Sequence, residues 1–383
     1  MANTLNLGNG NWATKEDSLL AYNSENGNFK PLPFDFTRAS SATVVNKAGL
    51  IETVGSGEPR IDFSNDAKGA LLLEPQRTNA IQWSDLFSAS STGGYYGLYW
   101  NAIITDNNTI SPDGSLNASK VVRGTDDVLI RALGVVTAST ANTTTLWAKK
   151  GNYDKMMLDI GDEAASTITL TDEWQRIETT TSSALNTHID ISMPNSASGD
   201  YIYIYGFQVE QGSYATSYIP TQGSAVTRSA DVCNNGGNEQ VINSTEGVLY
   251  AEISALGIAT NKYINIYQDA NNRILLWITS TGVIRGYAIV NSSGSDVFID
   301  AVGVDATNNN KIALSWQGFT LSLFVNGIKI GNSTVTNSFS TMNLTTLDLK
   351  DVTNANFFYG NVKDVRVYNT ALTDAELQAL TKI

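Results

Sequence analysis

Short apolar runs separated by turn-forming residues recur along this 383-residue chain. The clearest is Tyr201-Ile-Tyr-Ile-Tyr205, whose alternation places three tyrosines on one face of a strand and two isoleucines on the other. Turn signals rich in Gly, Asn and Pro recur about every 8–15 residues, a spacing typical of β-sandwiches and jelly rolls. The pattern therefore predicts an all-β fold.

The distribution of these runs divides the chain into segments. Residues 80–222 and residues 241–383 each carry enough strand-like runs for one β-sandwich. Between them, residues 223–240 include Asn234-Asn-Gly-Gly237 and are predicted to be a linker. Residues 1–79 hold only short runs that cannot bury a core alone, so they should pair with a following domain or with another subunit. We therefore expect two jelly-roll sandwiches in tandem after an extended N-terminal attachment and oligomerisation segment.

Two local signals stand out in the last sandwich. Asn326-Gly327 between apolar runs predicts a tight β-hairpin. Thr373-Asp-Ala-Glu376 is a capping box, which predicts a helix start at Thr373. Such a short helix is unstable alone, so its Leu377 and Leu380 face should pack on the sandwich.

Composition restricts the partners. The net charge is −13 and the sequence pI is about 4.5, which opposes binding to nucleic acid. No run approaches the ~20 apolar residues of a membrane span, so membrane insertion is not expected. No signal peptide is visible at the start, which favours synthesis in a cytoplasm. The acidic surface is compatible with Ca²⁺ binding or with plain solubility, and no cofactor is expected.

Residues suited to catalysis are scarce. The chain has one histidine, His188, and one cysteine, Cys233, and both are predicted to be structural. The Glu-x-Asp-x-x-Glu strand motif of lectin-fold glucanases is absent from the sequence. We therefore expect a protein that is not an enzyme. Carboxylates far apart in sequence can still meet in space, so a glycan depolymerase remains an alternative.

Aromatic side chains are concentrated between Trp83 and Trp100, in a polar stretch that contains glycine. Loop aromatics can stack on the C–H faces of sugar rings. The alternatives are that they cap the sandwich core or fill a trimer interface. By contrast, Trp147, Trp174, Trp277 and Trp316 lie in or beside strand patterns and are predicted to be core residues. The candidate glycan-binding residues are Trp83, Tyr95, Tyr96, Tyr99 and Trp100.

The N-terminal runs Pro33-Phe-Asp-Phe-Thr-Arg-Ala-Ser-Ser-Ala-Thr-Val-Val45 and Gly69-Ala-Leu-Leu-Leu-Glu-Pro-Gln-Arg-Thr-Asn79 carry a resemblance. They resemble the N-terminal part of head- and tail-fibre proteins of tailed bacteriophages, especially those of Bacteroidetes. This resemblance implies a virion-surface subunit, made in the cytoplasm of a bacterial host, that attaches to other virion proteins of the capsid or the tail. It also implies a homo-oligomer, most simply a trimer, and leaves head or tail open.

The attachment candidates follow from this resemblance and from residue chemistry. Arginine guanidiniums can clamp carboxylates or backbone carbonyls at a subunit interface, and the alternative is a solvated strand edge. The candidates for the attachment or oligomer interface are Trp12, Arg38, Arg60 and Arg77.

The two sandwiches carry resemblances of their own. Leu146-Trp-Ala-Lys149, Trp174-Gln-Arg176 and the run from Tyr203 to Gly212 resemble carbohydrate-binding-module jelly rolls. Ser322-Leu-Phe-Val-Asn-Gly-Ile-Lys329, followed by the run from Gly360 to Leu380, resembles the laminin-G-like, concanavalin-type lectin fold. Together these imply a phage fibre or spike subunit that adheres to host-surface or mucosal glycans. A ligand-free decoration protein of capsid or tail is the first alternative.

Overall fold

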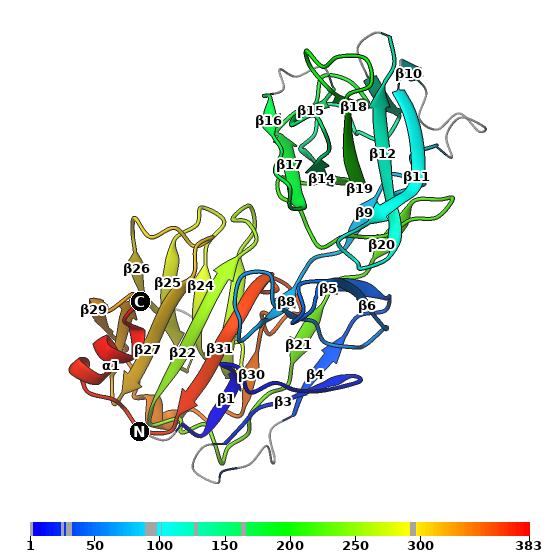
Figure 1. Cartoon of the computed structure of the whole chain (residues 1–383). Helices are drawn as coiled ribbons and strands as arrows, with labels where there is room; N and C mark the ends of the chain where they lie inside the picture. The colour runs from blue at the N-terminus through cyan, green and yellow to red at the C-terminus, as the bar shows by residue number, and fades with distance from the viewer. Residues whose placement is uncertain are drawn as a thin grey trace. The chain divides into compact units, whose positions relative to one another are not determined.

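The computed structural model describes residues 3–23, 27, 33–88, 98–100, 102–125, 129–161, 166–291 and 296–383. Within these ranges the fold is all-β with one short α-helix, as the sequence predicts. The chain forms two compact units (Figure 1). Unit 1 comprises Met1–Ser41, Val54–Pro75 and Ala230–Ile383, and unit 2 comprises Ala42–Thr53 and Gln76–Ser229.

Unit 1 is built on two large antiparallel sheets. The eight-stranded sheet has the order β29-β28-β27-β22-β31-β8-β7, and β1 also pairs with β31. Its strands are β1 (Leu5–Gly8), β7 (Ile61–Asp62), β8 (Ala70–Leu73), β22 (Glu246–Ala255), β27 (Asn310–Gln317), β28 (Thr320–Val325), β29 (Ile328–Thr334) and β31 (Gly360–Tyr368). The five-stranded sheet has the order β26-β25-β24-β23-β30. Its strands are β23 (Lys262–Asp269), β24 (Asn272–Ile278), β25 (Ile284–Ile289), β26 (Val297–Ala301) and β30 (Thr346–Asp348).

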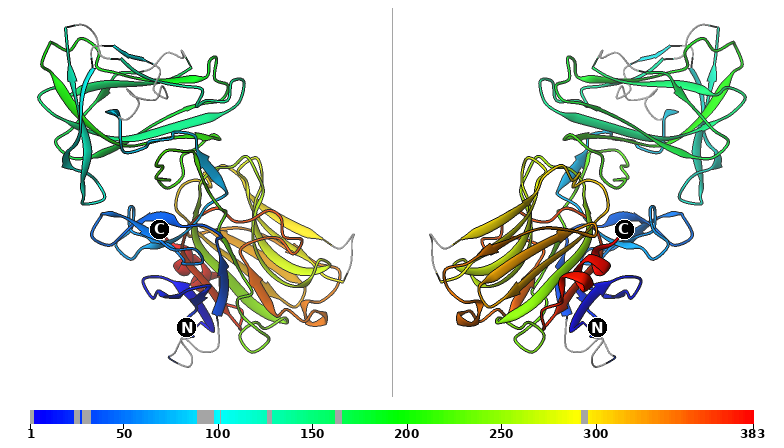
Figure 2. Two further views of the ribbon diagram at one scale, coloured as in Figure 1. Left: turned by 90° about the vertical axis from the view of Figure 1, so that its right-hand side faces the viewer. Right: turned by 90° about the vertical axis from the view of Figure 1, so that its left-hand side faces the viewer.

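Smaller elements complete unit 1. A four-stranded sheet contains β2 (Ala13–Lys15), β3 (Ser18–Leu20), β4 (Pro33–Thr37) and β21 (Val232–Asn234), and a 3₁₀ turn, η2, spans Phe339–Thr341. Helix α1 (Asp374–Thr381) lies against β27, β28 and β29. In the two side views of Figure 2, α1 lies on one side of the sandwich and the yellow strands lie on the other.

The core of unit 1 lies between its two large sheets. Side chains alternate across each strand, so every second residue of β22 and β24 points inward. In β31, Val362, Val365 and Val367 point inward. Leu249 of β22, Leu276 of β24 and Val365 of β31 are examples of the enclosed apolar side chains that result. Trp316 is completely buried in this core, as predicted.

Both local predictions for this unit are confirmed. Asn326 and Gly327 adopt left-handed φ angles of 52° and 82° and join β28 to β29 in a tight hairpin. The Thr373 hydroxyl accepts from the Glu376 amide, and the Glu376 carboxylate accepts from the Thr373 amide, which completes the capping box. Leu377 of α1 is buried against the outer face of the sheet.

Unit 2 is a second sandwich with two five-stranded antiparallel sheets. One has the order β11-β12-β19-β14-β17 and the other the order β10-β13-β18-β15-β16. The strands of the first are β11 (Ala102–Ile110), β12 (Leu116–Arg123), β14 (Asn142–Lys150), β17 (Gln175–Thr181) and β19 (Tyr201–Gln211). Those of the second are β10 (Leu98–Trp100), β13 (Leu129–Leu133), β15 (Lys155–Ile160), β16 (Ile168–Thr169) and β18 (His188–Ser192). Two small ribbons pair β5 (Ala42–Val45) with β6 (Ile51–Val54) and β9 (Arg77–Asn79) with β20 (Val226–Arg228).

The period of two in β19 is confirmed. Ile202 and Ile204 are fully buried in the core of unit 2, whereas Tyr201 and Tyr203 lie on the outer face of the sheet. Tyr205 also leaves this core and packs in a small cluster with Tyr218 and Trp147.

The division into units differs from the four segments expected from the sequence. The predicted attachment segment 1–79 contributes β1 and β8 to the main sheet of unit 1, and the predicted linker 223–240 contributes β20 and β21. Unit 2 is therefore an insertion between parts of unit 1 rather than a domain in tandem. The physical reason is strand pairing: short runs that cannot form a core satisfy their backbone groups against distant strands of unit 1 or unit 2.

Candidate functional site

An aromatic and arginine-rich surface covers the outer face of the five-stranded sheet in unit 1. Along β24, Ile274, Leu276 and Ile278 enter the core, so the alternate residues Arg273, Leu275 and Trp277 point outward. The same alternation sends Tyr263 of β23 outward, and Arg285 and Tyr287 of β25. Adjacent strands thus bring rings and guanidiniums from separate parts of the chain to one face.

The strand register sets the aromatic side chains in a row. Tyr263 pairs with Trp277, and Trp277 pairs with Arg285. The Tyr263 and Trp277 ring centroids are 5.4 Å apart at 71°, and those of Trp277 and Tyr287 are 6.1 Å apart at 76°. These are edge-to-face contacts, which fix each ring in one orientation.

Arg285 joins two of the aromatic rings. Its guanidinium carbon lies 4.7 Å from the Trp277 ring centroid and 4.2 Å from that of Phe298. Its Nε and Nη2 atoms donate to the two carboxylate oxygens of Asp300 at 2.6 and 2.8 Å. The hydrogen bond to Asp300 raises the pKa of Arg285 above its usual value. The Arg285 guanidinium is therefore held in one orientation, in cation–π contact with both rings.

Arg273 is held in a similar way. Its Nη1 donates to Asp351 at 2.7 Å, and its guanidinium carbon lies 5.9 Å from the Tyr287 ring centroid. Burial raises the pKa of Tyr263 and of Tyr287, so both phenols keep their protons at neutral pH and can donate hydrogen bonds.

These side chains enclose a shallow pocket of about 310 Å³, which we call the aromatic pocket. Leu275 and Tyr263 are buried at its floor, Trp277 and Tyr287 are half-buried, and Phe298 is 53% exposed at its rim. The pocket is lined by Tyr263, Arg273, Leu275, Trp277, Arg285, Tyr287, Asp296 and Phe298. It combines apolar rings with a few fixed polar groups, the usual composition of a small-ligand site.

Trp277 corrects a prediction from the sequence. It is expected in the core because Arg273-Ile-Leu-Leu-Trp-Ile278 is apolar at almost every position. The structure instead places Trp277 on the outer face of the sheet. The apolar residue Leu275 lies on the same face and is buried there by its neighbours, so the sequence of β24 shows no alternation of polar and apolar residues. The signal that could have found it is the recurrence of Tyr, Trp and Arg at alternate positions of adjacent runs. Trp147 and Trp174 are also half-buried rather than fully enclosed.

The predicted glycan-binding cluster lies in unit 2. Trp83 is half-buried and forms an isolated bridge with Gln222. Tyr95 and Tyr96 lie outside the described residues. Tyr99 and Trp100 belong to β10, which pairs with β13, but their side chains lie outside the described part. A glycan-binding role for these residues stays a prediction.

The predicted interface arginines Arg38 and Arg60 lie inside unit 1. Arg38 donates to Asp231 at 3.1 Å, and Arg60 donates to Glu74 at 2.6 Å and also to Asp231. Both guanidinium side chains are completely buried within one chain. Burial works to lower the pKa of Arg60, but the Glu74 and Asp231 charges raise it above the usual value. The guanidiniums of Arg38 and Arg60 thus clamp carboxylates and carbonyls within one chain, and a role for them at a subunit interface stays a prediction.

The remaining interface candidates are less enclosed. Trp12 is half-buried, and its indole Nε1 donates to the Lys68 carbonyl at 2.8 Å. Arg77 is half-buried in unit 2, with its guanidinium carbon 5.1 Å from the Tyr214 ring centroid. Their role in attachment or oligomerisation stays a prediction.

The single histidine and the single cysteine do not line the aromatic pocket. His188 is buried on β18, with its Nε2 atom 3.7 Å from Asp190, and Cys233 is buried on β21. Burial raises the pKa of the Cys233 thiol well above its usual value. Across the described residues, no three His, Cys, Asp or Glu side chains gather in a way that could hold a metal ion. Nor does any described helix have the length and apolarity needed to cross a bilayer.

Comparison with known families bears on unit 1. The family model of the concanavalin A-like lectin/glucanases superfamily matches residues 252–378, a span that contains the strands of the aromatic pocket. Unit 1 has a lectin-like jelly-roll fold. No curated protein matches the chain.

Several solved structures show some likeness to the chain. A carbohydrate-binding module of the Ruminococcus gnavus intramolecular trans-sialidase, bound to α2,3-sialyllactose, is 20% identical, with a TM-score of 0.33, over 39% of this chain and 94% of that one. Domain 4 of an extracellular arabinanase from Geobacillus stearothermophilus, in complex with arabinotriose, is 16% identical, with a TM-score of 0.32, over 44% and 81%. A Bacteroides ovatus protein described as carbohydrate-binding is 11% identical, with a TM-score of 0.29, over 74% and 81%.

Proposed function

We propose that unit 1 binds glycans in the aromatic pocket. The observation that carries this proposal is the row of Tyr263, Trp277 and Tyr287 rings beside two fixed guanidiniums. Sugar rings present C–H faces that pack on aromatic rings, while their hydroxyls take hydrogen bonds from polar groups at the edge. The match of this region to a lectin and glucanase superfamily supports the same function.

The charge of the site favours a neutral saccharide. Arg285 is paired with Asp300 and Arg273 with Asp351, so each guanidinium already has a carboxylate partner. Such a pair offers hydrogen-bond donors and acceptors side by side without a net positive charge. A sugar hydroxyl, which both donates and accepts, fits this arrangement better than a free anion does.

We further propose that the protein is a bacteriophage virion fibre or spike subunit that adheres to host-surface or mucosal glycans. The resemblance of the runs at 33–45 and 69–79 to fibre proteins supports this setting, as do the two sandwiches. In this account the protein is a homotrimer on the virion surface, is bound to other virion proteins, and acts without a cofactor or catalysis. Several weak sites on one particle would raise avidity by about 10²–10⁴.

One alternative use of the aromatic pocket has support from its composition. Trp, Tyr and Arg are also the residues enriched at the centres of protein interfaces. The face could therefore pack against a second subunit. Trp277→Ala separates the two functions, because it lowers glycan binding in the first case and lowers the oligomeric state in the second.

The first experiment is a glycan array probed with the full chain. Binding to one structural class of neutral glycans supports the adhesin, and no binding by the assembled oligomer contradicts it. Release of reducing ends from a host polysaccharide would replace the adhesin with a depolymerase. Immunogold labelling of intact particles would decide between head and tail.

A further inference from the structure

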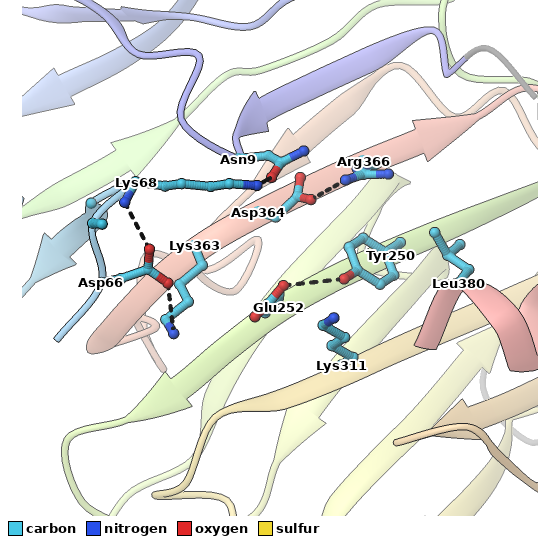
Figure 3. Close-up of a pocket in the computed structure, with 12 residues that line it drawn as sticks. Asn9, Asp66, Lys68, Tyr250, Glu252, Lys311, Lys363, Asp364, Arg366 and Leu380 are labelled. Carbon is cyan, nitrogen blue, oxygen red and sulfur yellow. Dashed lines mark hydrogen bonds and ion pairs between the residues drawn. The ribbon is translucent and has the colours of Figure 1, made fainter. Parts of the chain in front are cut away.

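A second pocket lies on the opposite side of the unit 1 sandwich, on the outer face of the eight-stranded sheet. It has a volume of about 470 Å³. Strands β22, β27 and β31 form its floor, and Lys68 and Asn9 lie across it from Leu380 of α1 (Figure 3). We call it the lysine pocket and define it by Lys68, Lys311, Lys363, Arg366, Glu252 and Asp364.

The lysine pocket has one more cationic than acidic side chain in its lining, and the ammoniums of Lys68 and Lys311 bond to uncharged groups. Three lysines and Arg366 line it, against the carboxylates of Asp66, Glu252 and Asp364, whereas the whole chain carries −13. The Lys363 ammonium lies 3.0 Å from Asp66, and the Lys68 ammonium donates to the Asn9 side chain at 2.9 Å. The Lys311 ammonium donates to the Lys382 carbonyl at 3.1 Å. Because an ammonium has three N–H groups, each lysine keeps donors for a ligand.

A β-bulge shapes the floor of the pocket. Glu252 pairs with Asp364 and Ile253 pairs with Val362, so Lys363 is an extra residue in β31. The bulge lets Lys363 and Asp364, which are consecutive, both line the pocket. It also places the Asp364 and Glu252 carboxylates opposite each other, a like-charge pair that is unfavourable across strands. Bulges that redirect side chains are common beside functional sites.

Asp364 has unused hydrogen-bonding capacity. Its side chain is buried, and one oxygen accepts from Arg366 at 2.5 Å. The other oxygen, Oδ1, is buried and has no hydrogen-bond partner among the described residues. Burial raises the pKa of Asp364 to about 6, against the effect of Arg366. A buried acceptor without a partner is costly to the fold.

We propose that the lysine pocket binds an acidic saccharide unit, with its carboxylate on the lysine ammoniums that line the pocket and its hydroxyls donating to the lining carboxylates. The lysines supply donors for the anion, and Glu252 and Asp364 supply acceptors for hydroxyls. A uronate has both kinds of group on one ring. The site is separate from the aromatic pocket and does not rest on glycan binding there.

The test is calorimetric titration of the full chain with trigalacturonic acid, and with a neutral galactose trisaccharide as the matched ligand. Lys363→Gln should weaken binding of trigalacturonic acid about tenfold, since a charge-assisted contact is lost. Lys329→Gln is the matched control: Lys329 is ion-paired to Asp374 at 2.7 Å, much as Lys363 is to Asp66, but lies outside both pockets. Lys311→Gln is a second variant if Lys363→Gln does not fold.

The proposal predicts that trigalacturonic acid binds more tightly than the neutral trisaccharide and that added salt weakens its binding. It also predicts that Trp277→Ala leaves this binding within about twofold. Failure of the wild-type chain to bind trigalacturonic acid would overturn the proposal. Equal effects of Lys363→Gln and Lys329→Gln would overturn it as well. Loss of binding in Trp277→Ala but not in Lys363→Gln would instead assign the acid to the aromatic pocket.

Discussion

Arg38 and Asp231 form a buried ion pair at 3.1 Å although 193 residues separate them in sequence. Arg38 also donates to the carbonyls of Gly55 and Glu58 at 2.5 and 3.0 Å. Asp231 accepts in addition from the Glu74 amide at 2.8 Å and from Arg60. In the sequence, these residues lie near the four boundaries between unit 1 and unit 2, which follow Ser41, Thr53, Pro75 and Ser229. The network therefore fastens, within unit 1, the chain segments that border the insertion.

Asp231→Ala should strongly destabilise unit 1. The substitution leaves the buried guanidiniums of Arg38 and Arg60 without a shared carboxylate, which costs about 3–5 kcal/mol for a buried pair. The free energy of unfolding, measured with urea, checks this. Lys329→Gln is the control within the same unit, because it removes a more exposed ion pair with Asp374 and should cost under about 1 kcal/mol. A loss of similar size in both variants would show that the network does not hold the unit together.

The same network shows what sequence can and cannot predict. Guanidinium chemistry indicates carboxylate partners for Arg38 and Arg60. It does not indicate Asp231, because the pairing of β4 with β21 that brings Asp231 close spans the whole of unit 2. The order of strands in space, rather than any local pattern, decides that contact.

The aromatic pocket is a similar case. The alternation of Tyr201 to Tyr205 and the Asn326-Gly327 hairpin were readable because each depends on adjacent residues. The row of Tyr263, Trp277 and Tyr287 depends on the register of three strands and on a buried Leu275 that breaks the visible alternation. Exposure of Trp277 therefore could not be predicted from its own run.

Helix α1 depends on its capping box. Thr373→Ala should lower the free energy of unfolding by about 1 kcal/mol, because it removes the acceptor for the Glu376 amide. Thr373→Ser keeps that acceptor and should retain most of the stability. Urea unfolding of both variants measures the difference. Equal losses would indicate that the threonine methyl group, and not the cap, stabilises the helix.

Asp85 should make the stability of unit 2 depend on pH. Burial, together with the nearby charge of Asp113, raises the pKa of Asp85 to about 6. Hydrogen bonds from Tyr218 and Ser84 lower this pKa but do not cancel the increase. A carboxyl whose pKa is raised on folding favours the folded state when protonated, so its contribution falls as pH rises from about 4 to 6. The expected loss is roughly 3 kcal/mol.

Asp85→Asn tests this by removing the titration. Calorimetric melting of unit 2 should show that the stability of the variant rises relative to that of the wild-type protein as the pH is raised. The change should occur between about two pH units below the Asp85 pKa of about 6 and a pH just above that pKa. A constant difference between the two proteins across that interval would show that Asp85 does not titrate in it.

The rim of the aromatic pocket offers a matched comparison. Phe298 is 53% exposed and lines the pocket, whereas Phe319 is 50% exposed and lies in the turn between β27 and β28. Phe298→Ala should weaken glycan binding several-fold, because it removes a ring that packs on Arg285. Phe319→Ala should leave affinity unchanged. Affinity measured on an immobilised glycan would contradict the assignment if both variants bound alike.

Glycan binding by unit 1 should depend on Trp277. The most direct measurement is calorimetric titration of the wild-type chain, Trp277→Ala and Trp100→Ala with the neutral glycan that binds best on the array. We predict that Trp277→Ala loses at least about tenfold in affinity, or roughly 1.4 kcal/mol, while its unfolding transition and oligomeric state stay those of the wild type. Binding by a folded Trp277→Ala at wild-type affinity would contradict it, and a loss confined to Trp100→Ala would move the site to unit 2.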